Sequence, residues 1–113
     1  MKIASALLVA LVPILFAGGP AVALKNDFSD QLKKLPEYRQ RAVLRRAVLD
    51  GNQYCRRIGP VAYQGPYKNL EMWTVSCDRG ATYGAFIGLD GSVQVRPCKD
   101  LATLKLPTCR LPK

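Results

Sequence analysis

Two hydrophobic periodicities divide the chain beyond its first 24 residues. Between residues 27 and 50 apolar side chains recur with the spacing of an α-helix, whereas between residues 53 and 96 they alternate along short runs bounded by glycine or proline. The pattern predicts an α+β fold, in which two N-terminal helices pack on a four-stranded antiparallel meander. No internal repeat interrupts it, so we expect one small domain over residues 24–113.

The first helix is expected to begin near residue 27. Phe28, Leu32 and Leu35 fall at i, i+4 and i+7 and would share one face of that helix. Either Asp27 or Ser29 could cap it, because both side chains can accept a hydrogen bond from a free backbone N–H of the first turn.

A second helix is predicted between Pro36 and Gly51. Proline suits the first helical position, and glycine suits the residue at which a helix stops. One apolar face is expected to meet the sheet: Val43, Leu44, Ala47 and Val48. A narrower apolar strip lies opposite, between arginines on both sides: Tyr38, Ala42 and Leu49. We regard this apolar strip as a contact either for the first helix or for a partner.

Three further runs alternate like the strands of a half-buried sheet: residues 70–77, 81–89 and 92–96. A consistent core face requires Val75 opposite Tyr83 and Ile87 opposite Val93. That register needs two three-residue loops with glycine in third place, where a left-handed backbone is required: Asp78-Arg79-Gly80 and Leu89-Asp90-Gly91. A two-residue turn between the last two strands would mix the two faces, so the longer loops are favoured.

An earlier strand is expected over about residues 53–63. A Gly-Pro pair inside it, at residues 59–60, marks a bulge or an edge strand. We expect this strand to fold back on the next one through residues 64–69. That turn would bring Cys55 opposite Cys77 to within about one residue, close enough for a bridge.

The cysteines number four and all follow the first 24 residues. In an exported chain an even set of this kind indicates disulfides, here Cys55–Cys77 and, by exclusion, Cys98–Cys109. A metal site is disfavoured, because even the closest pair has ten residues between its members and no C-x-x-C motif occurs. We therefore expect the cysteines to be structural and to bind no metal.

The N-terminal segment reads as an export signal. Residues 3–24 carry no charge, follow Lys2 and end beside an Ala-x-Ala pattern at residues 21–23. We expect a signal peptide over residues 1–23 and an exported protein, either periplasmic or extracellular. An uncleaved segment of this length could instead anchor the domain to the membrane.

Catalytic chemistry finds little support in the composition. The chain contains no histidine, which removes the commonest general base near neutral pH. No serine lies in a nucleophile motif, and four of the eight carboxylates, those of Asp27, Asp30, Asp78 and Asp90, sit where caps and turns are expected, Glu71 being the odd one. We expect no enzyme activity, no cofactor and no catalytic metal.

Charge points to an anionic partner. The formal net charge is +9, or +8 once Lys2 is removed with the signal. Six arginines are candidates for anion binding, and together they are called the arginine cluster: Arg39, Arg41, Arg45, Arg46, Arg56 and Arg57. The alternative is a solvated helix face, although only Glu37 and Asp50 stand nearby to neutralise the four helical arginines.

A second candidate contact surface lies on the sheet face turned away from the helices. Phe86, between two glycines, and Met72 would form an apolar island there, of the kind that can anchor a partner. The alternative cover is the C-terminal tail, which carries three leucines: Leu101, Leu104 and Leu106.

The stretch from Cys55 to Cys109 resembles a group of small exported bacterial proteins with four cysteines and no assigned function. The likeness lies in a cysteine-bearing first strand, then "WTVSC", "TYGAFIGLDGSVQV" and two closing cysteines. The resemblance implies the fold and the disulfide pairing, and it supplies no catalytic residues.

These observations predict a non-catalytic binding or accessory module of the bacterial cell envelope, such as a small subunit of a larger assembly. The expected partner is an envelope protein or complex. The alternative is an anionic lipid or polysaccharide held by the arginine cluster. Nucleic acid is disfavoured, because Trp73 and Tyr83 point to the expected core and no binding motif is present.

Overall fold

The computed structural model describes residues 25–111, and the predicted signal peptide over residues 1–23 lies outside them. The elements follow in the order α1 (Asp27–Lys34), α2 (Glu37–Asp50), β1 (Ile58–Tyr67), β2 (Leu70–Cys77), the 3-10 turn η1 (Asp78–Gly80), β3 (Thr82–Ile87), β4 (Val93–Pro97) and α3 (Cys98–Leu101). The sheet is an antiparallel meander with the strand order β1-β2-β3-β4. The predicted α+β fold is confirmed, with the one-turn helix α3 as an addition in the tail.

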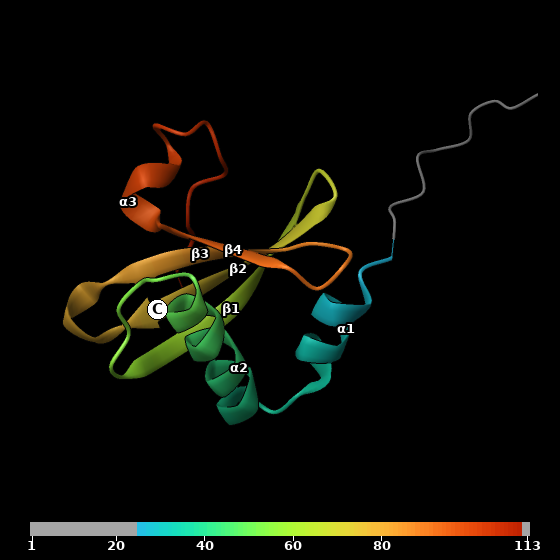
Figure 1. Ribbon diagram of the computed structural model, residues 1–113, viewed down its shortest axis with the longest axis horizontal. Coiled ribbons are helices and arrows are strands. Elements are labelled where there is room, and N and C mark those ends of the chain that lie inside the picture. The colour runs from blue at the N-terminus through green and yellow to red at the C-terminus, as the bar shows by residue number, and fades with distance from the viewer. Residues whose placement is uncertain (1–24, 112–113) are drawn as a thin grey trace, which may run out of the picture.

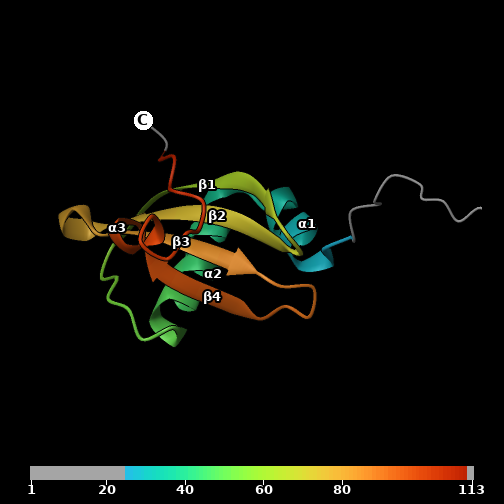
Figure 2. The same cartoon turned by 90° about the horizontal axis from the view of Figure 1, so that it is seen from above.

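The molecule has three layers (Figure 1). Helices α1 and α2 lie on one face of the sheet, and α3 with the C-terminal segment lies on the other face. Seen from above, β1 and β4 form the two edges (Figure 2). None of the helices within residues 25–111 has the length and apolar character needed to cross a membrane.

Asn26, rather than Asp27 or Ser29, caps α1. Its Oδ1 atom accepts a 2.9 Å hydrogen bond from the backbone N–H of Ser29, and its Nδ2 donates a 3.0 Å bond to the carbonyl of Ile87. The residue is extended and lies just outside the first turn, which is the position from which a side chain can reach the free N–H groups. The cap therefore also ties α1 to the sheet.

Helix α2 begins one residue later than predicted. Pro36 is extended and precedes the first helical residue, Glu37, whereas Gly51 ends the helix as expected. The backbone N–H of Gly51 donates to the carbonyl of Ala47 at 3.0 Å, and the left-handed conformation falls on Asn52. The helix thus stops cleanly before the chain turns back toward the sheet.

Only half of the predicted apolar face of α2 is buried. Leu44 and Val48 are inside and Ala47 is half-buried, but Val43 is 47% exposed. Helix α1 does not cover the apolar strip, because it lies beside α2 and inserts Leu32 into the same core (Figure 1). Both helices therefore pack on the sheet rather than on each other's outer side.

The predicted register of the last three strands is confirmed. Val75 lies opposite Tyr83, and Ile87 lies opposite Val93. Both three-residue loops are present, since Cys77 N–H donates to the carbonyl of Ala81 at 2.7 Å and Gly88 N–H donates to that of Ser92 at 2.8 Å. The third loop residues have the left-handed backbone that glycine favours: Gly80 and Gly91.

The first strand is displaced from its expected position. It begins at Ile58 rather than near residue 53, runs to Tyr67, and turns at residues 68–69 instead of 64–69. The predicted bulge at residues 59–60 is confirmed by a register shift. A second shift before Gly65 lets the chain pass through a Gly-Pro pair without leaving the sheet.

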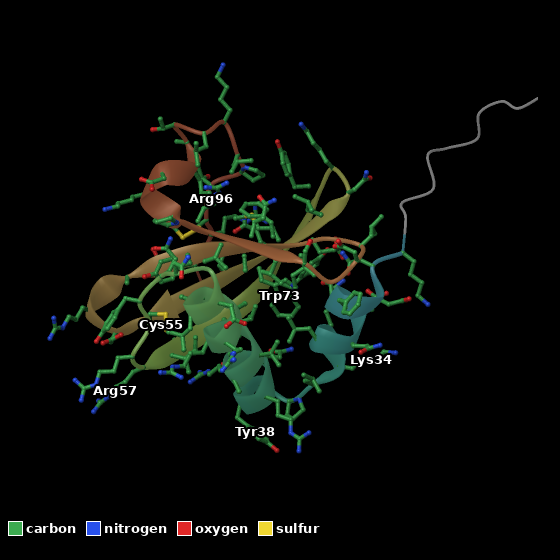
Figure 3. All side chains as sticks on the ribbon, in the orientation of Figure 1. Lys34, Tyr38, Cys55, Arg57, Trp73 and Arg96 are labelled. Carbon is green, nitrogen blue, oxygen red and sulfur yellow. A yellow bond between two sulfur atoms is a disulfide. The ribbon has the colours of Figure 1, made fainter. Side chains whose placement is uncertain are left out.

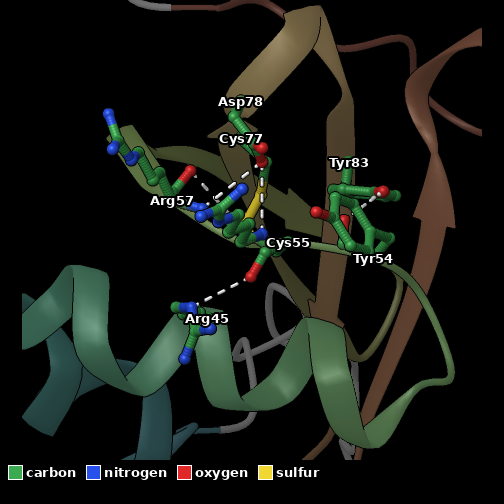
Figure 4. Close-up of a disulfide and its surroundings, with 8 residues drawn as sticks. Arg45, Tyr54, Cys55, Arg57, Cys77, Asp78 and Tyr83 are labelled. Atoms are coloured by element: carbon green, nitrogen blue, oxygen red, sulfur yellow. Dashed lines mark hydrogen bonds between the residues drawn. A yellow bond between two sulfur atoms is a disulfide. The ribbon is translucent and has the colours of Figure 1, made fainter.

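Both predicted disulfides are present. Cys55 and Cys77 have Cα atoms 5.4 Å apart, and those of Cys98 and Cys109 are 5.7 Å apart. Cys55 does not face Cys77 across the ladder, where Ile58 stands, but precedes β1 by three residues. The first bridge therefore fastens the connection after α2 to the end of β2 (Figure 4).

Candidate functional site

The apolar strip on α2 faces solvent. Tyr38 is 69% exposed, Leu49 is 37% exposed, and Ala42 between them is also exposed. All three lie on the side of the helix away from Leu44 and Val48, and Tyr38 points away from the sheet (Figure 3). The strip is therefore an open apolar surface of the described domain.

The helical arginines border this strip, but most of them already contact another group of the domain. Arg41 Nη2 lies 2.7 Å from a carboxylate oxygen of Glu37, and Arg46 Nε lies 3.2 Å from one of Asp50. Both pairs span one helical turn and are solvent-screened, so each adds only about 0.3–0.5 kcal/mol. Arg39 is exposed next to Tyr38, with its guanidinium carbon 5.8 Å from the ring centre.

Arg45 links α2 to the first disulfide. Its Nε atom donates a 2.9 Å hydrogen bond to the carbonyl of Cys55, which precedes Arg56 and Arg57 (Figure 4). The backbone N–H groups of Arg56 and Arg57 both donate to one carboxylate oxygen of Asp78, at 3.1 and 3.3 Å. The side chains of these two arginines are left exposed.

The Asp78 carboxylate is electrostatically stabilised in this arrangement. Burial on its own would raise its pKa, but the backbone N–H groups of Arg57, Arg56 and Asp78 itself, together with the charge of Arg79, hold the pKa of Asp78 below its usual value. A charged acceptor therefore organises the segment that carries the two exposed arginines.

The six arginines do not gather at one place. Arg41 and Arg45 border one side of the strip and continue toward residues 56–57, whereas Arg39 and Arg46 border its other side. The predicted arginine cluster is therefore two basic borders with an apolar strip between them. A single concave anion site does not result.

The predicted island of Met72 and Phe86 is not an open surface. Met72 is 1% exposed and Phe86 2%, because Leu101 of α3 packs on them with Leu106 and Cys109. The prediction that they contact a partner is corrected by this burial, and the alternative cover by the tail holds. Leu104, in contrast, stays 47% exposed.

An apolar groove that sequence reasoning missed lies between α1, α2 and the β3–β4 turn. It has a volume of about 270 Å³, and an adjoining hollow beside Arg46 shares several of its walls. Both hollows are lined by Val43, Gly91 and Val93, and the first also by Phe28 and Leu35. We call this feature the hairpin groove.

The hairpin groove arises because α1 and α2 are side by side rather than stacked. Phe28 is 49% exposed and rests its ring on Gly91, where a methyl group would come within 2.8 Å of the ring. Helical spacing placed Phe28 with Leu32 on one face but could not show that this face overhangs the sheet edge. Val43 on the facing helix gives no such signal either, because its helical position predicts contact with the sheet, whereas it is 47% exposed.

Glu71 belongs to a polar cluster that fastens α1 to the sheet. It accepts a 2.9 Å hydrogen bond from the Tyr63 hydroxyl and lies 3.4 Å from Lys33 Nζ, which sits 3.9 Å from the centre of the Tyr63 ring. Burial, followed by the hydrogen bond and the charge of Glu71, raises the pKa of Tyr63 to about 12. Glu71 is therefore a structural residue of β2 that joins Tyr63 of β1 and Lys33 of α1.

Metal-binding groups are not assembled in the part of the chain that the structure describes. No three side chains of the usual metal-ligating types lie together within residues 25–111, and the four cysteines there are all in disulfides.

Comparison of the chain with protein-family models, with curated proteins and with solved structures finds no match. The resemblance to small exported four-cysteine proteins stays a prediction.

Proposed function

We propose that this domain is a non-catalytic binding module of the bacterial cell envelope that holds an acidic protein partner against the outer side of α2. The observation that carries the proposal is the apolar strip, in which Tyr38 and Leu49 are exposed between two arginine borders. Aromatic side chains and arginine are enriched at protein contacts, because they bury large areas and also offer polar atoms.

The two disulfides support a role outside the cytosol. Two disulfides indicate an oxidising, exported environment, since the cytosol keeps such thiols reduced. The predicted signal peptide is consistent with export, and the envelope is our proposal for where the domain works.

The charge of the domain supports an acidic partner. Of the 17 basic residues, 15 lie within residues 25–111, since only Lys2 and Lys113 fall outside, and all 8 acidic residues lie inside, so the described part has a formal net charge of +7. A surplus of this size accelerates encounters with acidic surfaces and disfavours basic ones.

Lipid or polysaccharide remains the alternative ligand. Its support is the adjacent pair Arg56 and Arg57, whose side chains are exposed. It is the weaker proposal, because Arg41 and Arg46 already pair with carboxylates and Arg45 donates to a backbone carbonyl. Such binding would depend on charge alone and would be screened by salt.

The test is native sizing of the protein in its own gently solubilised envelope, with Leu49→Asp compared against Thr103→Asp. Thr103 is exposed beyond α3 on the opposite side of the sheet, so the control adds the same charge away from the strip. We expect the wild type and Thr103→Asp to migrate with a larger complex and Leu49→Asp to migrate alone.

Two outcomes would contradict the proposal. Migration of the wild type alone would remove the partner, and unchanged migration of Leu49→Asp would remove the strip as its contact. Release of all variants between about 0.05 and 0.5 M salt, with no effect of Leu49→Asp, would favour the anionic lipid or polysaccharide.

A further inference from the structure

The two edges of the sheet differ in how well they are protected. Edge β1 contains Pro60 and Pro66, is interrupted by two register shifts, and has the Gln64 carbonyl occupied by a 2.9 Å hydrogen bond from Arg110 Nη2. Prolines, bulges and a covering segment are the means by which proteins block edge pairing. Edge β1 is therefore closed to a further strand.

Edge β4 has free backbone groups. In an antiparallel ladder hydrogen-bonded pairs alternate with non-bonded pairs, and the bond from Gly88 N–H to Ser92 fixes the phase for β3 and β4. Val93 and Val95 then direct their N–H and C=O groups outward, away from β3. Among residues 25–111 no hydrogen bond reaches these outward groups.

The two faces of the sheet differ in chemistry next to edge β4. On the α2 side lies the hairpin groove with Phe28 and Val43, and Arg46 borders the adjoining hollow. On the other side the exposed side chains of β4 are Gln94 and Arg96, and Arg96 stands away from α2 (Figure 3). An added strand would therefore meet an apolar surface with one set of side chains and a basic one with the other.

We propose that edge β4 receives a fifth strand, an extended segment of the acidic partner in which apolar and acidic residues alternate. The inference rests on the proposed function and names the form in which the partner binds. Its apolar side chains enter the hairpin groove, its carboxylates reach Arg96, and its backbone bonds to Val93 and Val95. Strand addition to a free edge is a common mode of peptide recognition, with backbone bonds for affinity and side-chain pockets for specificity.

Charge argues for this occupant over a second copy of the chain. Two copies paired through β4 would bring together two domains that each carry +7 over the described residues, and would place Arg96 of one near Arg96 of the other. An acidic segment meets the same groups with attraction.

The probe is a synthetic peptide of about ten residues that alternates valine and glutamate, with a valine–lysine peptide as the charge control. Binding is followed by amide chemical shifts and hydrogen exchange of the whole exported domain with its disulfides intact. We expect the valine–glutamate peptide to slow exchange of the Val93 and Val95 amides and the valine–lysine peptide to leave them unchanged.

Val93→Pro and Val93→Thr form a matched pair of variants. Proline removes the outward N–H of Val93, which has no partner within the described chain, whereas threonine keeps that N–H and a similar volume. We expect Val93→Pro to weaken peptide binding by at least about tenfold and Val93→Thr to leave it within about threefold. A peptide N-methylated at every second residue gives the same test without altering the protein.

Charge reversal completes the test. In Arg96→Glu the preference should invert, so that the valine–lysine peptide binds and the valine–glutamate peptide does not. Absence of amide protection at saturating peptide, or equal binding by the N-methylated peptide, would overturn the inference. Protection that grows with protein concentration and needs no peptide would make a second copy the occupant and overturn it as well.

Failure here is distinguishable from failure of the proposed function. Leu49→Asp lies outside the hairpin groove and should leave peptide binding unchanged. If the peptide fails while the wild type still migrates with its complex, only the strand site is wrong. If both fail, the domain has no acidic partner.

Discussion

Trp73 in the middle of β2 donates a 3.0 Å hydrogen bond from its indole Nε1 to the hydroxyl of Ser29, 44 residues earlier in α1. Trp73 is 2% exposed and Ser29 is fully buried. The bond lies at the junction that Asn26 also secures, so α1 is held to the sheet by buried polar contacts in addition to its short apolar face. The position of α1 sets one wall of the hairpin groove.

Ser29→Ala is expected to destabilise the domain more than its small change in volume suggests. It leaves the buried indole N–H without a partner, at a cost of about 1–3 kcal/mol in the free energy of unfolding. Urea unfolding measures the loss, with Thr103→Ala as an exposed control expected to stay within about 0.5 kcal/mol. A Ser29→Ala protein as stable as the control would mean that water or another acceptor satisfies Trp73.

Aspartate at Leu49 and aspartate at Phe86 should destabilise the domain to very different extents. Leu49 is exposed, so Leu49→Asp should change the unfolding free energy by less than about 0.5 kcal/mol. Phe86 is buried beneath Leu101, so Phe86→Asp both opens a cavity and buries a carboxylate, and should cost more than about 3 kcal/mol. Thermal unfolding of the two variants separates a contact residue from a core residue. Equal melting temperatures would contradict the burial of Phe86.

The two disulfides should differ in what their removal exposes. Each bridge is expected to stabilise the domain by about 3 kcal/mol, and the one closing 22 residues by about 0.6 kcal/mol more than the one closing 11. Replacing Cys98 and Cys109 by alanine should also loosen the tail that covers Met72 and Phe86.

Dye binding tests that difference. The Cys98/Cys109 double variant is expected to bind an apolar fluorescent dye while the amides around Val75 stay protected from exchange, since Val75 belongs to the other core cluster. The Cys55/Cys77 double variant should lose protection there first. Dye binding by neither variant would show that α3 holds the tail without its disulfide.

Much of the sheet could be predicted from the sequence because local rules govern it. The alternation in residues 70–96 fixes which side chains face the core, and glycine at positions 80 and 91 fixes the length of each loop. Predicting the core face and the loop lengths requires only the two-residue period of a strand and the ability of glycine to adopt a left-handed backbone.

The displaced first strand could not be predicted in the same way. The sequence predicts a turn over residues 64–69, and Gly65 and Pro66 within it have the composition of a turn. In the fold, pairing with β2 continues through them by way of a bulge, because tertiary packing outweighs local preference. The cap at Asn26 is different, because asparagine is a favoured capping residue and its bond to the Ser29 N–H is local, so only its second bond, to the distant carbonyl of Ile87, lies beyond sequence rules.

The candidate contact surfaces required neighbours that periodicity does not supply. The wheel of α2 correctly separates Leu49 from Leu44, but it cannot tell whether another helix covers the outer side. The same limit applies to the hairpin groove, which exists because Phe28 and Val43 come from different helices and meet beside β4. The sequence predicts which helix faces are apolar, but it does not predict which of these faces remain exposed to solvent in the folded domain.

Tyr63 offers a pH-dependent test of the polar cluster on β1 and β2. Burial, with the hydrogen bond and charge of Glu71, raises the pKa of Tyr63 to about 12 from the ordinary value of 10.0. Because the folded state holds the proton more tightly than the unfolded chain, this contribution to stability is complete below pH 10 and is lost as the pH rises toward 12. The domain should therefore lose stability across that window.

Absorbance of tyrosinate near 295 nm, taken as the difference between the wild type and Tyr63→Phe, isolates this one of the five tyrosines. We expect its midpoint near pH 12, and in Glu71→Gln a midpoint that falls but stays above 10, because burial is the larger cause and remains. Circular dichroism on the same samples confirms that the domain is still folded. A midpoint at 10 in the folded wild type would mean that Tyr63 and Glu71 are apart in solution, and that α1 is held to the sheet by Asn26 and Ser29 without them.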